Sequence, residues 1–164
     1  MSLYALCEWL QNTQIGTSIR ESIWVFPIIE SAHVLGLAIS VGLLVWFDLR
    51  LVGWTMRHQP ISVMHRQLMP WSLVGFSIMF LSGALLFWSN ALRAYNSGFF
   101  QLKVLFLFLA AVNAIVFELT TKRRIAEWDK APLPPKRVRL AGMLSLALWI
   151  AVITFGRATA YNLF

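Results

Sequence analysis

The chain has 164 residues, of which 59% are hydrophobic and 13% charged, and its mean hydropathy is +0.68. Soluble domains carry about 25% charged residues, so this composition excludes an ordinary soluble domain and indicates a membrane protein with several spans. The net charge of +7 fits Lys/Arg-rich cytoplasmic loops facing anionic lipid, and no nucleic acid is expected as a partner. The single cysteine, Cys7, excludes an intrachain disulfide and a multi-cysteine metal site.

The first predicted element is an amphipathic helix over residues 3–19. Leu3, Leu6, Trp9 and Leu10 recur there at helical spacing, with polar residues on the rest of the turn. This pattern is typical of a helix that lies in the plane of the membrane interface.

Four apolar stretches follow, each long enough to cross a hydrocarbon layer of about 30 Å at a rise of about 1.5 Å per residue. The predicted spans are residues 23–47, 71–88, 102–119 and 140–161. The expected fold class is therefore all-α, an integral-membrane bundle of four transmembrane helices with an N-terminal interfacial helix. We expect a single membrane domain over residues 1–164, because the spans must pack together.

The basic residues predict an orientation in the membrane. Ten of the 14 lie in or beside two loops, 48–70 and 120–139, that would share one side of the membrane. The excess places these loops in the cytoplasm and both termini on the outer, periplasmic side. The ten residues are Arg50, Arg57, Arg66, Lys122, Arg123, Arg124, Lys130, Lys136, Arg137 and Arg139.

Four ionisable residues form a predicted outer layer within the spans. Glu30 and His33 are three residues apart and share a helix face. Helical rise places Glu30 and Arg157 about 26 Å, Lys103 about 24 Å and His33 about 21 Å above the cytoplasmic ends of their spans. One interpretation is an interhelix clamp, in which Glu30 pairs with Arg157 or Lys103. The other is a polar pocket that binds an anionic or quinone-like head group, or that relays protons.

A second polar set, Asp48, Arg50 and Glu118, is expected near the cytoplasmic ends of the spans. No catalytic residue is predicted in either set.

Haem binding can be examined by the same measure of depth. His33 is the only histidine predicted within the spans, because the loop 48–70 contains His65, about 20 Å below His33. One iron cannot bridge that separation, so a haem b held by two histidines is not expected. A haem b held by His33 alone, a haem held by His58 or His65 of the loop, or a quinone beside His33 stays open as a cofactor. No metal site is predicted.

Short motifs follow one another along nearly the whole chain. They are Pro27-Ile-Ile-Glu30-Ser-Ala-His33-Val-Leu-Gly36, Asp48-Leu-Arg50-Leu-Val-Gly53, Met69-Pro70-Trp71, Gly75-Phe76, Ser82-Gly83, Leu86-Phe87, Phe100, Lys103, Asn113-Ala114, Trp128-Asp129, Ser145-Leu146-Ala-Leu148-Trp149, Gly156-Arg157 and Ala160-Tyr161. In this order they resemble a family of small four-span bacterial inner-membrane proteins of unknown function. The resemblance implies the four-span fold and a bacterial inner membrane, and it supplies no reaction. Members often carry a histidine after the Asn113 segment, where this chain has Glu118, and this departure weakens any two-histidine cofactor scheme.

The function favoured by the sequence is that of a non-catalytic accessory or anchoring subunit in a larger inner-membrane complex. Its expected partners are the lipid bilayer and other membrane subunits or further copies of the chain. Two alternatives stay open. One is a redox membrane subunit that binds haem b or quinone near His33 and Glu30, and the other is a small transporter or proton-relay protein that uses the outer layer.

Overall fold

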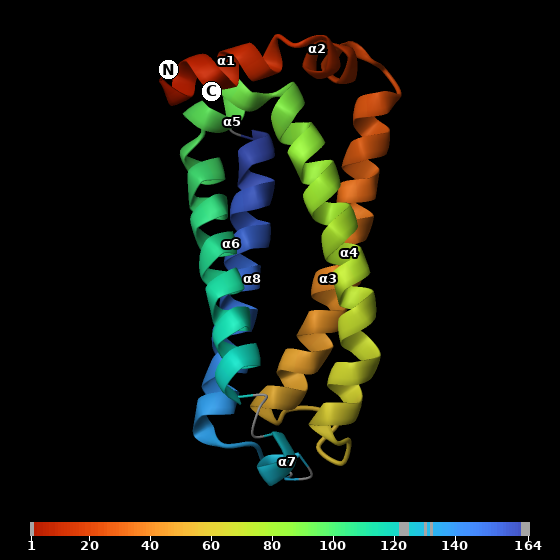
Figure 1. The fold of residues 1–164 in the computed structure, drawn as a ribbon, viewed down its shortest axis with the longest axis vertical. Coiled ribbons are helices and arrows are strands. Elements are labelled where there is room, and N and C mark those ends of the chain that lie inside the picture. Colours follow the sequence, from red (N-terminus) through yellow and green to blue (C-terminus); the bar gives the residue numbers. More distant parts are fainter. Residues whose placement is uncertain (1, 122–124, 130, 132, 162–164) are drawn as a thin grey trace.

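The computed structural model describes residues 2–121, 125–129, 131 and 133–161 and consists of helices joined by short connections (Figure 1). No strand occurs among these residues, so the predicted all-α class is confirmed. The elements are α1 (Leu3–Gln11), α2 (Gln14–Glu21), α3 (Val25–Val52), α4 (Ile61–Ser89), α5 (Ala91–Asn96), α6 (Gly98–Val116), the π-helix η1 (Phe117–Thr121), α7 (Ile125–Trp128) and α8 (Lys136–Tyr161).

Four helices, α3, α4, α6 and α8, are long and apolar enough to cross a membrane. The largest difference from the predicted spans is at α4, which begins at Ile61 although the predicted span begins at 71. Pro70 lies inside this helix and does not end it. Proline removes one backbone hydrogen bond, and a long membrane helix tolerates that loss. At the end of α3, Gly53 adopts the left-handed conformation with φ of 84° and terminates the helix.

The bundle is built from two helix pairs. Helix α3 packs along α4 and α6 packs along α8, and contact between α3 and α8 joins the pairs (Figure 1). Glycines allow the closest approach, between α3 and α4. A Cβ atom on Gly36 would lie 2.8 Å from the backbone nitrogen of Met79, and one on Gly75 would lie 2.6 Å from that of Ser40.

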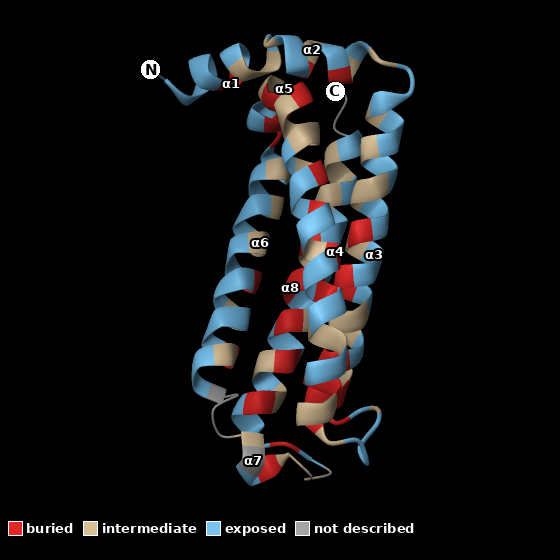
Figure 2. Ribbon diagram, turned by 45° about the vertical axis from the view of Figure 1, so that its right-hand side comes forward, coloured by how far each residue is buried: buried red, intermediate tan, exposed pale blue. Residues whose placement is uncertain are grey.

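The apolar core has two parts, one near the α3–α4 loop and one in the middle of the bundle. Buried residues concentrate on the facing sides of α3, α4 and α8, whereas α6 is mostly exposed (Figure 2). The first part contains Phe47, Leu51, Ile61, Met64, Phe117, Trp128 and Val138, and the second contains Val41, Met79, Ala110, Leu148, Trp149 and Val152.

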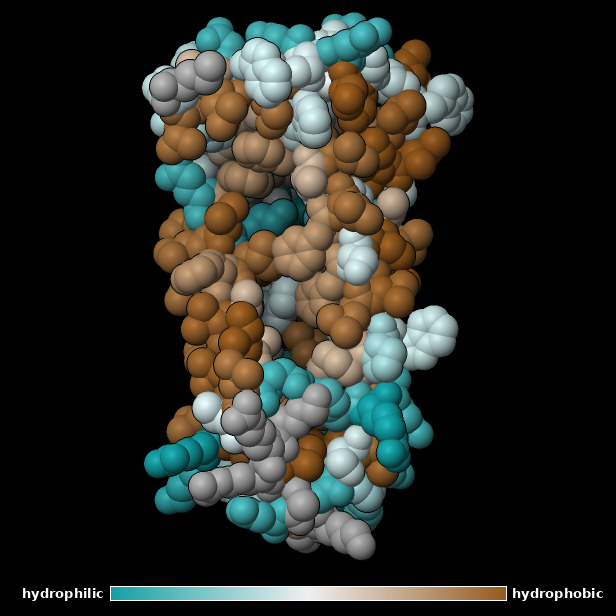
Figure 3. Space-filling model, viewed as in Figure 1, coloured by the Kyte–Doolittle hydropathy of each residue, from teal (hydrophilic) through white to brown (hydrophobic). Residues whose placement is uncertain are grey.

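The surface follows the pattern expected of a membrane-spanning bundle. On the face shown in Figure 3, hydrophobic side chains cover the long helices and hydrophilic side chains gather at both ends. Helices α1, α2 and α5 lie at one end, together with the end of α8, and α7 and the α3–α4 loop lie at the other (Figure 1).

The N-terminal segment differs from the single predicted helix over residues 3–19, because it forms two helices. The side chain of Thr13 accepts a hydrogen bond from the backbone N–H of Gly16 at 3.2 Å and starts α2, which runs on to Glu21. The segment is tied to the end of α4. The indole N–H of Trp88 donates to the Thr13 hydroxyl at 2.8 Å, and Arg20 donates to the carbonyl of Ser89 at 3.2 Å.

Candidate functional site

His33 lies on α3 against α4, next to the close contact of Gly36 with Met79. Its Nδ1 atom is 2.8 Å from the carbonyl oxygen of Met79 and 3.1 Å from the Ser82 hydroxyl. A carbonyl can only accept, so Nδ1 carries the hydrogen and the Nε2 atom of the neutral ring keeps a free lone pair. No hydrogen bond reaches Nε2 from any described residue. Gly83 makes room for the ring, since a Cβ atom there would lie 2.9 Å from His33 Cε1.

Lys103, on α6, is a second base near this histidine. It lies within electrostatic range of His33. Its alkyl chain runs beside Gly156 of α8, where an added Cβ atom would be 3.4 Å from Lys103 Cδ. The ammonium nitrogen stands 6.0 Å from the ring centroid of Phe100. It forms neither a hydrogen bond nor an ion pair with any residue in the described ranges.

The two remaining outer-layer residues, Glu30 and Arg157, are both exposed. Arg157 donates a hydrogen bond to the Tyr161 hydroxyl at 2.9 Å, and its guanidinium carbon lies 4.9 Å from the Tyr161 ring centroid. Over the residues that the structure describes, no ion pair joins Arg157 to Glu30. Glu30 is within electrostatic range of His33. Glu30 and Lys103 are therefore each within electrostatic range of His33, and Arg157 lies against its own helix. A ligand role for these residues stays a prediction.

Arg50, in the second polar set, is fully buried and its side chain forms hydrogen bonds with two backbone segments. Its Nε atom donates to the carbonyl of Gln59 at 2.9 Å and its Nη2 atom donates to the carbonyl of Ala131 at 3.1 Å. Asp129 supplies a nearby negative charge. These contacts hold the α3–α4 loop against the segment after α7.

Asp48 occupies a different place, the contact between α3 and α8. Its carboxyl group is buried beside the Ser145 hydroxyl. Helix α8 comes this close because residue 142 is glycine: a Cβ atom on Gly142 would lie 3.1 Å from the Asp48 carbonyl oxygen.

Glu118 lies in η1 and pairs with a residue that the sequence analysis placed in a loop. His65 Nε2 is 2.6 Å from Glu118 Oε1, and the imidazole packs edge-on against Phe47 with 5.5 Å between ring centroids. The expected loop position of His65 is wrong, because α4 begins before it and the histidine is buried on that helix. A helical signal was available in the spacing of Ile61, Met64, His65, Leu68 and Met69.

The predicted cytoplasmic-end set is therefore divided among three environments rather than gathered in one site. Arg50 binds loop carbonyls, Asp48 lies between α3 and α8, and Glu118 binds His65. Within the described part of the chain, no group of three or more His, Cys, Asp or Glu side chains is placed to hold a metal ion.

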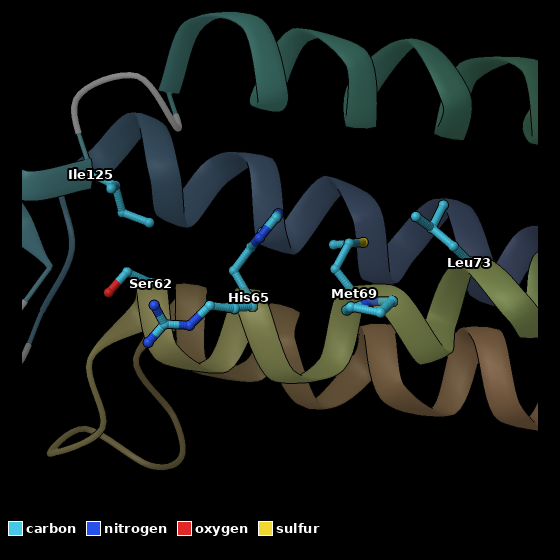
Figure 4. Close-up of a pocket in the computed structure, with 7 residues that line it drawn as sticks. Ser62, His65, Met69, Leu73 and Ile125 are labelled. Atoms are coloured by element: carbon cyan, nitrogen blue, oxygen red, sulfur yellow. The ribbon is translucent and has the colours of Figure 1, made fainter.

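A cavity of about 500 Å³ opens beside His65, along the side of α4 that faces Ile125 of α7 (Figure 4). His65 forms part of its inner wall, and Ile125 of α7 closes one end. The residues that line it are Ser62, His65, Arg66, Met69, Pro70, Leu73 and Ile125.

The four long apolar helices, with hydrophobic side chains over the face shown in Figure 3, define a four-span membrane bundle. Residues 7–162 match the family of unknown function DUF6644, and the chain belongs to this family. No curated protein and no solved structure matches the chain.

Proposed function

We propose that this protein is a non-catalytic accessory or anchoring subunit of a larger complex in a bacterial inner membrane. The observation that supports this function is the exposure of α6. In the 18-residue apolar stretch of this helix only 11% of the residues are buried within the chain, against 33% in the corresponding stretch of α8. Apolar side chains such as Phe108 (63% exposed) and Ile115 (56% exposed) project away from the bundle. Membrane helices associate through close packing, and α6 offers a long face for a neighbouring helix.

The proposed orientation places the α3–α4 loop and α7 in the cytoplasm and both termini in the periplasm. Among the described basic residues, Arg57, Arg66, Lys136, Arg137 and Arg139 lie at the α7 end, and the positive-inside rule assigns this end to the cytoplasm. Lys122, Arg123, Arg124 and Lys130, which contributed to the predicted excess, lie outside the described residues.

Extraction of the tagged chain from native membranes in polymer nanodiscs tests the proposed function. The expected result is a particle that contains a second membrane subunit, or further copies of the chain, in fixed stoichiometry. The double variant Phe108→Ala/Ile115→Ala should weaken this association. The matched variant Ile150→Ala/Ile153→Ala removes two side chains that are also exposed. These residues lie on α8 and not on the proposed face of α6, so this variant should leave the association intact. Recovery of the wild-type chain as a monomer with lipid alone would contradict the proposal.

A second candidate function is that of a redox membrane subunit, and it is favoured by the hydrogen bond at His33. Histidines that ligate a metal commonly donate the other ring N–H to a backbone carbonyl. The bond from Nδ1 to the Met79 carbonyl leaves Nε2 available to ligate haem iron or to accept a hydrogen bond from a quinol hydroxyl. Lys103 and Glu30 would supply charges beside such a group.

Absorption spectra and quinone analysis of the detergent-purified protein separate these two candidates. Stoichiometric haem with a Soret band that shifts on reduction, or co-purified quinone, either one lost in His33→Ala, would establish the redox function. His58 is an exposed histidine of the α3–α4 loop and provides the control. Equal loss of the haem or quinone in His58→Ala would count against His33 as the site.

A further inference from the structure

The cavity beside His65 extends across the boundary between the hydrophilic end of the molecule and its hydrophobic band. Ser62 lies near Ile125 of α7, and Leu73 lies further along α4 (Figure 4). Along this helix the polar lining residues Ser62 and Arg66 come before the apolar ones, Met69 and Leu73. From residue 62 to residue 73 the helix rises about 16 Å. A volume of about 500 Å³ along this length is large enough for a lipid head group and the start of its acyl chains.

Among the described charged side chains that line the cavity, Arg66 is available to a ligand. The Asp129 carboxylate accepts hydrogen bonds from the backbone N–H and the hydroxyl of Ser62, both at 2.7 Å. Glu118 is engaged by His65. Arg66 is exposed, lines the cavity, and forms no hydrogen bond or ion pair with another described side chain. Its guanidinium can hold two phosphate oxygens through paired donors.

The backbone beside Arg66 provides a further polar group. Pro70 has no N–H, so it cannot donate the helical hydrogen bond to the carbonyl of Arg66, four residues earlier. Both residues line the cavity. A ligand that carries hydroxyl groups next to an anionic centre could donate to such a carbonyl.

Apolar side chains form the rest of the wall. Met69 and Leu73 follow Arg66 along α4 on the cavity side, and Ile125 covers the hydrophilic end from α7 (Figure 4). A free anion would gain nothing from this apolar surface, whereas a lipid acyl chain would be buried against it.

We propose that this cavity is a binding site for an anionic phospholipid, with the phosphate on Arg66 and an acyl chain along Met69 and Leu73. Basic pockets beside membrane helices on the cytoplasmic side commonly hold anionic head groups. Phosphatidylglycerol has the required chemistry, because it joins an anionic phosphate to glycerol hydroxyls that can donate hydrogen bonds. The site does not depend on the accessory or the redox function.

Lipid titration of the delipidated full-length protein, followed by native mass spectrometry, tests the proposal. The probes are phosphatidylglycerol and phosphatidylcholine with identical acyl chains. One basic contact near a membrane surface is worth about 1 kcal/mol, which corresponds to a preference of about 5-fold for phosphatidylglycerol. Arg66→Gln should abolish this preference. The matched variant Arg137→Gln should retain it, because Arg137 is exposed at the same end but does not line the cavity.

Cavity-filling variants separate this site from general attraction between a basic surface and anionic lipid. Met69→Trp should weaken binding of both lipids several-fold. Leu73→Trp, at a position that is 57% exposed, serves the same measurement if Met69→Trp does not fold. Equal losses of preference in Arg66→Gln and Arg137→Gln, or unchanged binding in a folded cavity-filling variant, would overturn the proposal. Displacement of phosphatidylglycerol by low millimolar inorganic phosphate would also overturn it, since the site would then be one for a free anion.

Discussion

The contact of α3 with α4 at Gly75 gives the sharpest test of the bundle's geometry. A Cβ atom at this position would lie 2.6 Å from the Ser40 nitrogen, 2.9 Å from the Gly36 oxygen and 3.0 Å from Ser40 Cα. All three atoms belong to backbone, so no side-chain rotation can relieve the overlap. The helices must separate, which also strains the hydrogen bond from Ser72 to the Ser40 carbonyl at 2.9 Å.

The expected cost of Gly75→Ala is about 2–3 kcal/mol, at the upper end for overpacking, because the contacts are with backbone. Lengthening of the interhelix hydrogen bond adds about 0.6 kcal/mol. Gly42→Ala is the matched control, since nothing lies within 4 Å of a Cβ atom there and the change favours the helical state. Unfolding in mixed micelles, followed by circular dichroism, measures both variants. If Gly75→Ala and Gly42→Ala differ by less than about 0.5 kcal/mol, the close contact is not present.

Three further predictions concern single contacts. The hydrogen bond between His65 and Glu118 should give a coupling of about 1 kcal/mol in a double-mutant cycle of His65→Ala and Glu118→Gln, and strict additivity would show that the two do not interact. Gly83→Ala should displace the imidazole of His33, which NMR of ¹⁵N-labelled histidine would detect as a shifted Nδ1 signal; an unchanged spectrum would refute the packing. Cys7 is 7% exposed, so an impermeant maleimide should label it slowly in micelles and rapidly after unfolding in SDS, and rapid labelling of the folded protein would contradict its burial.

The four spans were predictable because hydrophobic length is a one-dimensional property of the sequence. The start of α4 was not, because Pro70 and the polar residues near it were interpreted as a loop. The helix continues through Pro70 and places His65 in the interior, where it meets Glu118. The apolar spacing from Ile61 to Met69 carried the missing information.

The outer layer shows the limit of arguments from helical rise. Rise gives the depth of a residue but neither the rotation of its helix nor its neighbours across the bundle. Glu30 and Arg157 have matching depths, yet both are exposed and Arg157 binds Tyr161. His33 and Lys103 are brought into electrostatic range by the packing of α3 with α4 and α8 and of α8 with α6, which depth alone does not specify.

Site-specific photo-crosslinking in native membranes tests the proposed accessory function most directly. A photoreactive amino acid is placed at Phe108 on α6 and, in a separate strain, at Leu81 on α4, which is 70% exposed. The proposal predicts a protein adduct of one defined mass from Phe108 and lipid adducts from Leu81. Lipid adducts alone from both positions would contradict it, because the exposed face of α6 would then contact only the bilayer.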